Sequence, residues 1–320
     1  DGLLRTVLTI VFNVLLLAVF PMGVTGYMLA NVLADGLAAV FVFLHAREWQ
    51  YFRPSAVNRR SIARMLQYCI PLIPNTLCSW IINISDRYLI AMLVGNAATG
   101  IYAVSNKIPT VLLTVANTFS SAWQLSALVE QPRSERECFF SNVYTVYSSF
   151  AFVVASGVML TSQISTRLLA APEYYEAWRY VPILTLATTF ACLGSFLSSI
   201  YMVEQRSGAV LTTTFLGAVV NIAGNLFMIP LWESMGAAVA TLISYAFVFG
   251  VRAIHTRTML PIRLGLLKLL ACSLLMGLQC VMMEGNLLLW PLWSCSIFLA
   301  VTAINIRPLQ MAAKRAFWSR

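Results

Sequence analysis

The stretch LQYCIPLIPNTLCSWIINISDRYLIAMLV, residues 66–94, decides the fold class of this chain. It is apolar along nearly all of its length, and Asp86 and Arg87 are its only formal charges. A helix of roughly 20 apolar residues crosses the hydrocarbon core of a bilayer, so the run predicts a membrane-spanning helix. Charges within such a helix are costly unless they face protein or water, and we expect that of Asp86 and Arg87.

The rest of the chain repeats this apolar character. Of its 320 residues 59% are hydrophobic and 10% are charged, against about 25% charged residues in soluble domains. The apolar runs do not alternate with the period of two that spanning strands need. The sequence therefore predicts an all-α polytopic membrane protein of about ten transmembrane helices. The expected spans are 3–22, 24–45, 66–94, 98–128, 139–164, 179–203, 209–229, 235–254, 265–283 and 287–306.

The basic residues predict the orientation of these spans. One alternating set of connections, which includes loop 46–65 and the C-terminal tail, holds all but four of the 21 Lys and Arg residues. The four others are Arg167 and Arg179 in the opposite set and Arg87 and Lys107 within spans. The positive-inside rule then places both termini in the cytoplasm of a multi-pass protein of the inner (plasma) membrane. Topology accounts for the net charge of +9, so no nucleic-acid partner is expected.

The remaining composition is uninformative about chemistry. Seven cysteines lie mostly within spans, as small apolar residues do. His45 and His255 have no ligand-like spacing, so neither a metal site nor a cofactor is expected. The chain begins with Asp1 rather than Met, and we expect an N-terminal part to precede it.

Polar residues recur at helical spacing within four spans. Spacings of three and four place side chains on one helix face, and a lipid-facing helix does not carry such faces cheaply, so they are expected to line protein contacts or a wet cavity. The third span carries Asn75, Ser79, Asn83 and Asp86, bordered by Arg87. The fourth carries Asn106, Thr110, Thr114, Asn117, Ser121 and Gln124, flanked by Lys107. The second carries Asn31 and Asp35, and the seventh Gly217, Asn221 and Asn225.

Simpler interpretations of these residues stay open. Polar side chains join helices in membranes at about 0.6 kcal/mol per contact, and for Asn221 and Asn225 beside Gly217 such packing is the favoured interpretation. Asp86 and Arg87 are alternatively a helix-end pair near the outer interface, although the span continues to Val94. Lys107 is harder to place outside a cavity, because six residues past Ile101 it can snorkel only part of the way out.

Two prolines, Pro71 and Pro74, stand at the start of the third span. Each removes a backbone hydrogen bond and clashes with the preceding turn, which predicts a kinked or opened helix. Transporters use such breaks as hinges at the cavity wall. A static kink is the alternative.

These residues resemble a known family. The segment that continues the opening stretch, GNAATGIYAVSNKIPTVLLTVANTFSSAW (residues 95–123), completes a region 66–123 that is similar to the polysaccharide flippases, the Wzx-type exporters of O-antigen and related lipid-linked sugars. The two-Pro entry, the Asp-Arg-Tyr near the helix end and the following Gly-Ile-Tyr carry the resemblance. GAVVNIAGNLFMIPLWESMGAAVATLISY (217–245) resembles the same family in its Asn-containing helix followed by Pro, Gly-Ala-Ala and Thr. The resemblance covers essentially the whole chain.

The resemblance implies a fold. Such flippases belong to the multidrug/oligosaccharidyl-lipid/polysaccharide exporter superfamily, in which about fourteen helices form two lobes around a cavity. The chain would be the C-terminal part of that fold, N-terminally truncated. Residues 1–64 would be the two-helix remnant of the first lobe with a basic cytoplasmic loop, 65–254 the six-helix second lobe, and 255–320 a trailing helix pair with a basic tail.

The resemblance also implies a transporter rather than an enzyme. A polyprenyl-pyrophosphate-linked oligosaccharide would be flipped across the membrane by alternating access, for biosynthesis of lipopolysaccharide O-antigen or a related polysaccharide of the cell envelope. Arg87 and Lys107 would attract the pyrophosphate, Asp86 and Asp35 would hold those cations or carry a coupling ion, and the polar stripes would meet sugar hydroxyls. Membrane lipids, a polysaccharide polymerase and glycosyltransferases are the expected partners.

Three alternatives remain. A multidrug exporter of the same superfamily would favour acidic residues for cationic drugs, whereas acids and bases within the spans balance two to two. A sugar polymerase or ligase usually needs a long outer loop and paired carboxylates, and the longest loop predicted here, 46–65, is basic and cytoplasmic. A structural scaffold would not need Lys107.

Overall fold

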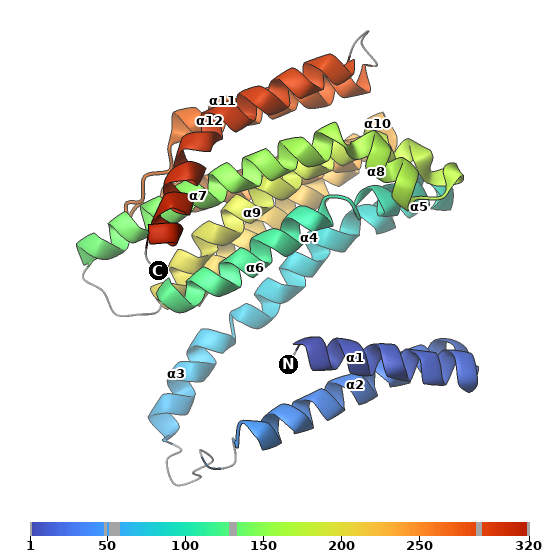
Figure 1. Cartoon of the computed structure of the whole chain (residues 1–320), viewed down its shortest axis with the longest axis vertical. Coiled ribbons are helices and arrows are strands. Elements are labelled where there is room, and N and C mark those ends of the chain that lie inside the picture. The colour runs from blue at the N-terminus through green and yellow to red at the C-terminus, as the bar shows by residue number, and fades with distance from the viewer. Residues whose placement is uncertain (1, 48–49, 51–57, 128–132, 286–289, 319–320) are drawn as a thin grey trace. The chain divides into compact units, whose positions relative to one another are not determined.

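The structure is a computed structural model that describes the backbone of residues 2–47, 50, 58–127, 133–285 and 290–318, and the side chains of these residues except 121–135 and 312–318. Within these ranges the regular elements are all helices (Figure 1). Eight helices of the described chain are long and apolar enough to cross a membrane. The protein is therefore an all-α, multi-pass membrane protein, as predicted.

The chain divides into two compact units, Asp1–Met65 and Leu66–Arg320. In the first unit, α1 (Gly2–Asn13) continues as the π-helix η1 (Val14–Val19), and α2 (Gly23–His45) packs back against both. Gly23 has φ +58, a left-handed conformation that glycine adopts without strain at the turn. Ala30, Ala34 and Ala38 are buried at every fourth position of α2, and small side chains at this spacing let helices approach closely.

The second unit follows α3 (Arg59–Cys69), which crosses the boundary between the units. Its elements, in chain order, are α4 (Leu72–Leu93), α5 (Asn96–Ser105), α6 (Thr110–Ala127), α7 (Arg133–Leu160), α8 (Ser162–Leu169), the 3-10 helix η4 (Pro172–Arg179), α9 (Val181–Val203), α10 (Ser207–Thr256), α11 (Leu266–Glu284) and α12 (Trp290–Trp318). Helix α10 packs against both α9 and α4, and α12 against α7. The grouping of predicted spans into lobes stays a prediction.

Helix α10 is a hairpin of two helical arms rather than one rod. Trp232 and Glu233 have non-helical backbone angles, two residues after Pro230. Beyond them the chain reverses so tightly that a Cβ on Gly236 would lie 2.2 Å from the carbonyl oxygen of Met228. The first arm (207–231) and the second arm (234–256) correspond to the predicted spans 209–229 and 235–254.

The predicted span 98–128 is wrong as a single helix. A turn over residues 106–109 separates α5 from α6, and Lys107 lies in this turn. Pro109 explains the break, because it lacks an N–H to donate to Ser105 and its ring clashes with the preceding turn. The eight candidate spans count the two arms of α10 as one helix and leave out the shorter apolar helix Thr110–Ser120, so they agree with the prediction of about ten.

The predicted loop 46–65 is also wrong in its last part, because α3 begins at Arg59. Arginine is a good helix former, so the density of charge that suggested a loop is equally suited to an exposed helix. The central part of this loop lies outside the described residues. The predicted break at the prolines is confirmed: α3 ends at Cys69, and α4 begins at Leu72 with Pro71 as its N-cap and Pro74 in its first turn.

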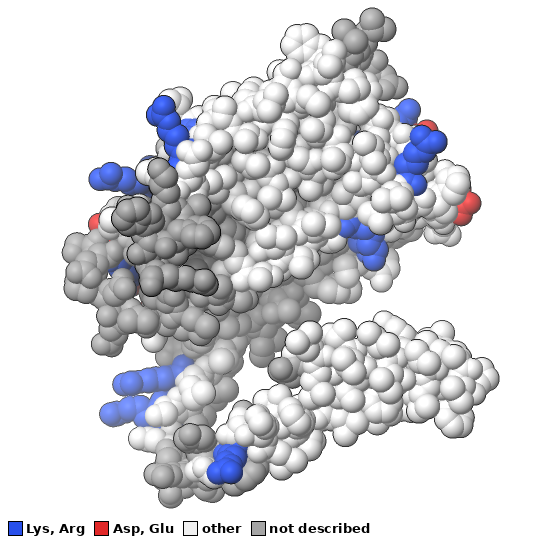
Figure 2. Space-filling view, in the orientation of Figure 1, with Lys and Arg blue, Asp and Glu red and all other residues white. Residues whose placement is uncertain are grey.

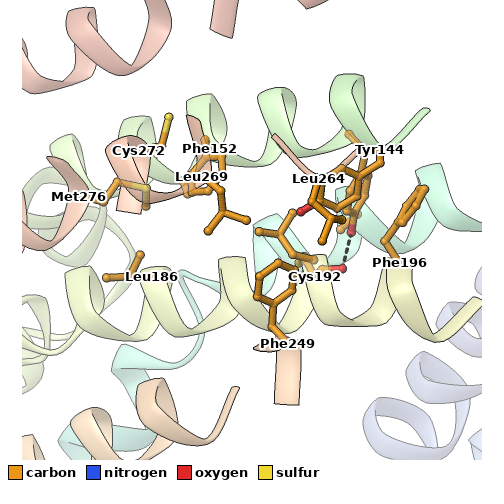
Figure 3. Close-up of a cluster of buried hydrophobic side chains, with 14 of the residues drawn as sticks. Tyr144, Phe152, Leu186, Cys192, Phe196, Phe249, Leu264, Leu269, Cys272 and Met276 are labelled. Carbon is orange, nitrogen blue, oxygen red and sulfur yellow. Dashed lines mark hydrogen bonds between the residues drawn. The ribbon is translucent and has the colours of Figure 1, made fainter. Parts of the chain in front are cut away.

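An apolar core holds the second unit together (Figure 3). It joins α7, α9, the second arm of α10, α11 and α12, with Phe196 of α9 in contact with Tyr144 and Tyr147 of α7. The Tyr147 hydroxyl donates a 3.1 Å hydrogen bond to the carbonyl of Cys192. Charged side chains stand toward the helix ends, leaving a broad uncharged surface over α7 (Figure 2). Two pockets lined by residues of α4, α9 and α10 lie beside this core.

Candidate functional site

Asp86 is the centre of a buried polar cluster. Its side chain is 4% exposed and accepts three hydrogen bonds: from the Tyr102 hydroxyl (3.0 Å), from the Thr241 hydroxyl (2.6 Å) and from the Asn225 amide (2.6 Å). The donors come from α5 and from both arms of α10. All three are neutral, and no ion pair to Asp86 occurs among the described residues.

Further oxygen atoms surround this carboxylate. Asn221 Oδ1 accepts hydrogen bonds from Ser85 (2.9 Å) and from the Asn225 amide (3.2 Å), and Asn221 Nδ2 donates to Thr241 at 3.4 Å. Asn225 Oδ1 is buried and has no hydrogen-bond partner in the described part of the chain. An acid, two amide oxygens and a hydroxyl thus meet in one dry place, a set of atoms suited to a proton or a small cation.

The position of Asp86 on its helix corrects the predicted polar stripe. Cys78, Ile82, Asp86 and Ile90 are the buried residues of α4, spaced by four. Asp86 therefore lies on the packing face, not on the face of Ser79 and Asn83. Ser79 and Asn83 share their side of α4 with Arg87, the next residue at the same spacing.

Arg87 lines a polar pocket of about 210 Å³ together with Asn83, Asp86, Asn106 and Thr241. We call this space the Arg87 pocket. The Arg87 side chain is half-buried, and its Nε is buried without a hydrogen-bond partner among the described residues. The guanidinium thus keeps donors available for a ligand.

Asn83 and Asn106 both line the Arg87 pocket. Asn83 Oδ1 accepts a 3.1 Å hydrogen bond from the Tyr245 hydroxyl, and Asn106 Nδ2 donates to the carbonyl of Tyr102 at 2.9 Å. Asn83 Nδ2 also donates a 2.7 Å hydrogen bond to the carbonyl of Ser79, and each amide NH2 group keeps a second N–H that these bonds do not use. The pocket therefore offers neutral hydrogen-bonding groups beside its cation.

A second pocket of about 130 Å³ adjoins the first. Arg252, Ser79, Gly194 and Thr214 lie on its wall, and we call it the Arg252 pocket. The two pockets share Ile82, Asn83, Ala191 and Tyr245 as lining residues. They are neighbouring parts of one polar groove between α4, α9 and α10.

The structure does not bring every predicted site residue to this groove. Lys107 is exposed in the turn 106–109 and is not on the wall of either pocket. Asn117 is exposed on α6, and Asn75 is half-buried on α4 with an unpaired, buried Oδ1. Gln124 lies in α6, but its side chain is outside the described residues.

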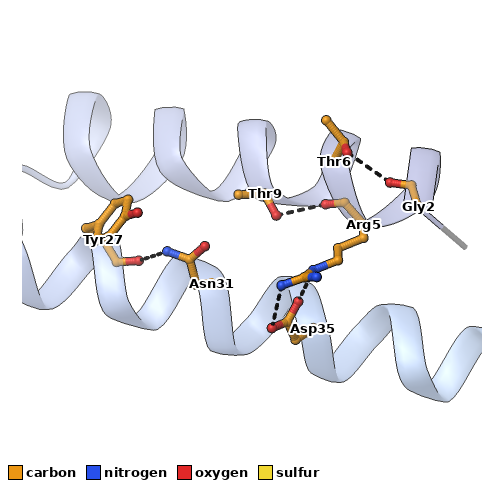
Figure 4. A network of polar contacts seen from close by, with 7 residues as sticks. All are labelled: Gly2, Arg5, Thr6, Thr9, Tyr27, Asn31 and Asp35. Atoms are coloured by element: carbon orange, nitrogen blue, oxygen red, sulfur yellow. Dashed lines mark hydrogen bonds and ion pairs between the residues drawn. The ribbon is translucent and has the colours of Figure 1, made fainter. Parts of the chain in front are cut away.

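Asp35 belongs to the first unit, where Arg5 of α1 holds it in a 2.5 Å ion pair (Figure 4). Both side chains are more than half exposed. Within this unit Asp35 thus has its own basic partner, Arg5. Asn31, on the same helix, donates to the backbone carbonyl of Tyr27.

Sequence analysis missed two basic residues that lie inside the bundle. Arg252 was counted with the cytoplasmic connections, yet its side chain is only 8% exposed. Lys268 was counted with them too, yet its amine donates a 2.5 Å hydrogen bond to Ser149 of α7. The available signal was spacing: Ser244, Val248, Arg252 and Thr256 follow one another at intervals of four and are all buried.

Known proteins share both sequence and fold with this chain. Residues 3–122 match the model of a family described as polysaccharide biosynthesis protein. The lipid II flippase MurJ, in an inward closed conformation, superposes with a TM-score of 0.60 at 13% identity, over 94% of this chain and 65% of MurJ. A transporter of the MOP superfamily from Pyrococcus furiosus gives a TM-score of 0.50 at 16% identity, over 78% of this chain and 67% of its own.

The chain thus spans just under two thirds of the length of MurJ. A comparison with the sequences of curated proteins gives no match. The predicted resemblance agrees with these findings: residues 3–122 are similar to a family described as polysaccharide biosynthesis protein, and the fold is similar to that of the flippase MurJ and of a MOP-superfamily transporter.

Proposed function

We propose that the protein flips a lipid-linked oligosaccharide across the cytoplasmic membrane by alternating access, to supply the synthesis of a cell-surface polysaccharide such as lipopolysaccharide O-antigen. The match to a polysaccharide biosynthesis family supports the broad class. The fold shared with a protein named as a lipid II flippase supports the mode of transport, because that protein flips a lipid by name. The carrier proposed for this chain is polyprenyl pyrophosphate.

This proposal rests mainly on the position of the Arg87 side chain. It places a guanidinium with an unpaired, buried Nε on the wall of a polar pocket within an apolar bundle. A guanidinium forms strong, often bidentate hydrogen bonds with phosphate oxygens, and more so where water is scarce. The amides of Asn83 and Asn106 line the same pocket and are suited to sugar hydroxyls.

Asp86 is proposed to carry the coupling ion. The three neutral donors to this buried carboxylate bring no positive charge, so a proton or small cation bound beside it would supply the charge that balances it. The side chains that donate hydrogen bonds to Asp86 come from α5 and both arms of α10. An ion bound here would therefore change how these helices are held together. Such differential binding is what a driving ion requires.

The remaining expectations complete this proposal. Both termini face the cytoplasm, the break at Pro71 and Pro74 serves as a hinge, and residues 1–64, 65–254 and 255–320 belong to the first lobe, the second lobe and the trailing pair. A polymerase would take up the flipped product, and glycosyltransferases would supply the substrate. A multidrug exporter for cationic compounds is less well supported, since Asp86 on the pocket wall is buried and already accepts three hydrogen bonds, whereas Arg87 on the same wall keeps an unpaired Nε.

The test uses the natural protein in cells that lack their own flippase. Wild type should restore surface polymer, Arg87→Gln should lose most of that export at equal membrane abundance, and Lys107→Gln is the matched control. Lys107 bears the same charge but does not line either pocket, so removing its charge should reduce polymer export less than Arg87→Gln does. The proposal fails if Arg87→Gln exports normally, or if wild type restores no polymer and instead extrudes cationic dyes.

A further inference from the structure

Arg252 is a buried cation without an acidic partner. It lies in the second arm of α10, and its guanidinium donates three hydrogen bonds: to Thr213 Oγ1 (3.1 Å), to Thr214 Oγ1 (2.9 Å) and to the carbonyl of Gly194 (2.9 Å). All three acceptors are neutral. No ion pair to Arg252 occurs among the described residues.

A role in holding α9 and α10 together does not by itself explain why a charged residue stands at position 252. Taking a guanidinium out of water is costly, and neutral acceptors repay that cost poorly. Arginine has five N–H donors, and the three bonds above leave two of them without a partner in the described chain. A neutral side chain would join α9 to α10 at a lower cost.

The Arg252 pocket gives these donors a place to act. Arg252 and Thr214 lie on its wall, whereas Thr213 does not. Gly194 leaves room beside the guanidinium, since a Cβ there would lie 3.9 Å from Arg252 Nη1. Ser79, Asn83 and Tyr245 add neutral polar groups around the same space.

The distance to Arg87 indicates what such a site would bind. Ser79 of the Arg252 pocket and Arg87 lie eight residues apart on α4, which is about 12 Å along the helix. The two pockets adjoin through Asn83 and Tyr245. An elongated polar molecule in this groove would meet a guanidinium near each end.

We propose that Arg252 binds a second anionic group of the transported molecule, an oxyanion carried by its glycan, so that the protein prefers oligosaccharides that contain an acidic sugar. This inference rests on the proposed flippase function, in which Arg87 takes the pyrophosphate. The oxyanion is the carboxylate of a uronic acid or a phosphate attached to a sugar, because a guanidinium pairs with either.

The experiment uses the purified natural protein in lipid nanodiscs and three synthetic probes. Each probe is a polyprenyl-pyrophosphate disaccharide, and the terminal sugar is glucose, glucuronic acid or glucose 6-phosphate. Binding is measured by native mass spectrometry. A charge-assisted hydrogen bond should make the acidic probe bind about tenfold more tightly than the glucose probe, and the better of the two acidic probes identifies the oxyanion.

Arg252→Gln should bind all three probes with the affinity that wild type has for the glucose probe. Arg252→Lys should keep part of the preference, since it retains charge but not the planar fork. Thr213→Val is the matched control for a role in joining the helices. It removes the hydrogen bond that Arg252 donates to Thr213, a residue that does not line the pocket, and should keep the preference for the acidic probes.

The outcomes separate this inference from the proposed function. If wild type binds the three probes equally, or if Arg252→Gln keeps the preference, Arg252 is not an anion site. If Arg252→Gln weakens all three probes by the same factor, its role is bracing alone and the inference is wrong. If no probe binds wild type, the proposed function itself fails, whereas a loss of all binding in Arg87→Gln alone supports that function.

Discussion

Asp86 on α4 accepts a 2.6 Å hydrogen bond from Thr241 on the second arm of α10, although 155 residues separate the two in the chain. Asn225 on the first arm donates a bond of the same length to the other carboxylate oxygen. One buried side chain therefore holds both arms of the hairpin to α4, and the same carboxylate lies on the wall of the Arg87 pocket. Ion occupancy at Asp86 and the arrangement of these helices are expected to be linked.

Asp86→Asn should separate the charge from the packing. The amide has nearly the same shape, and the hydroxyls of Tyr102 and Thr241 can act as acceptors as well as donors, so the helices should stay joined. Without the charge, transport should fall strongly and lose its response to an imposed proton or sodium gradient. Flipping assays in proteoliposomes with and without each gradient would measure this.

Asp35→Asn is the matched control, because Asp35 is an exposed acid paired with Arg5 in the first unit. A gradient response that survives in Asp86→Asn but disappears in Asp35→Asn would move the coupling site to the first unit.

The helices of this fold were largely predictable, because each needs only local information. Apolar runs of spanning length located α2, α9 and α11 to within two residues of their observed ends. The errors occurred where a single residue breaks a helix within a run, as Pro109 does between α5 and α6. The opposite error occurred at the basic residues before the third span. They were assigned to a loop, yet α3 is helical from Arg59 onward.

The site was predictable in its residue types but not in its pairings. Asp86, Arg87, Asn83 and Asn106 were all expected, and all line one pocket. No spacing rule links Asp86 to Asn225 across 139 residues, because that contact depends on how α10 folds back on α4. Arg252 was missed for the same reason: near a helix end, a cation is expected to point outward until the neighbouring helix is known.

Orientation in the membrane is tested by labelling single cysteines with a membrane-impermeant reagent in intact cells. Cysteines introduced in 165–178 should react from outside, because the positive-inside rule places this connection there. Cysteines in 46–65 should react only after the cells are opened. The natural exposed cysteines, Cys69, Cys138 and Cys295, must first be replaced. Labelling of 46–65 from outside would contradict the predicted orientation.

The prolines between α3 and α4 are tested together. In Pro71→Ala/Pro74→Ala the backbone regains two N–H donors, which should favour a continuous helix across residues 70–71. We expect insertion to be unchanged and transport to be slower, because a hinge would have been stiffened. Pro182→Ala at the start of α9 is the control, since proline in the first turn interrupts no helix. Wild-type transport rates in the double variant would make the break a static kink.

The turn of the α10 hairpin gives the sharpest stability prediction. A Cβ at Gly236 would lie 2.2 Å from the carbonyl oxygen of Met228 and 2.9 Å from the backbone nitrogen of Ile229. Both are backbone atoms, so Gly236→Ala must push the two arms apart rather than rotate a side chain. Overpacking of this kind lowers the free energy of unfolding by about 1–3 kcal/mol. The displaced arms are those that carry Asn225 and Thr241.

Gly250→Ala is the matched control, because it lies in the second arm with no atom within 4 Å of its added Cβ. Replacing a helical glycine by alanine at an open site should stabilise the helix by up to about 1 kcal/mol. Thermal unfolding in detergent should therefore shift downward for Gly236→Ala and stay level or rise for Gly250→Ala. Equal shifts in the two variants would mean that the close approach of Gly236 to Met228 does not hold the hairpin.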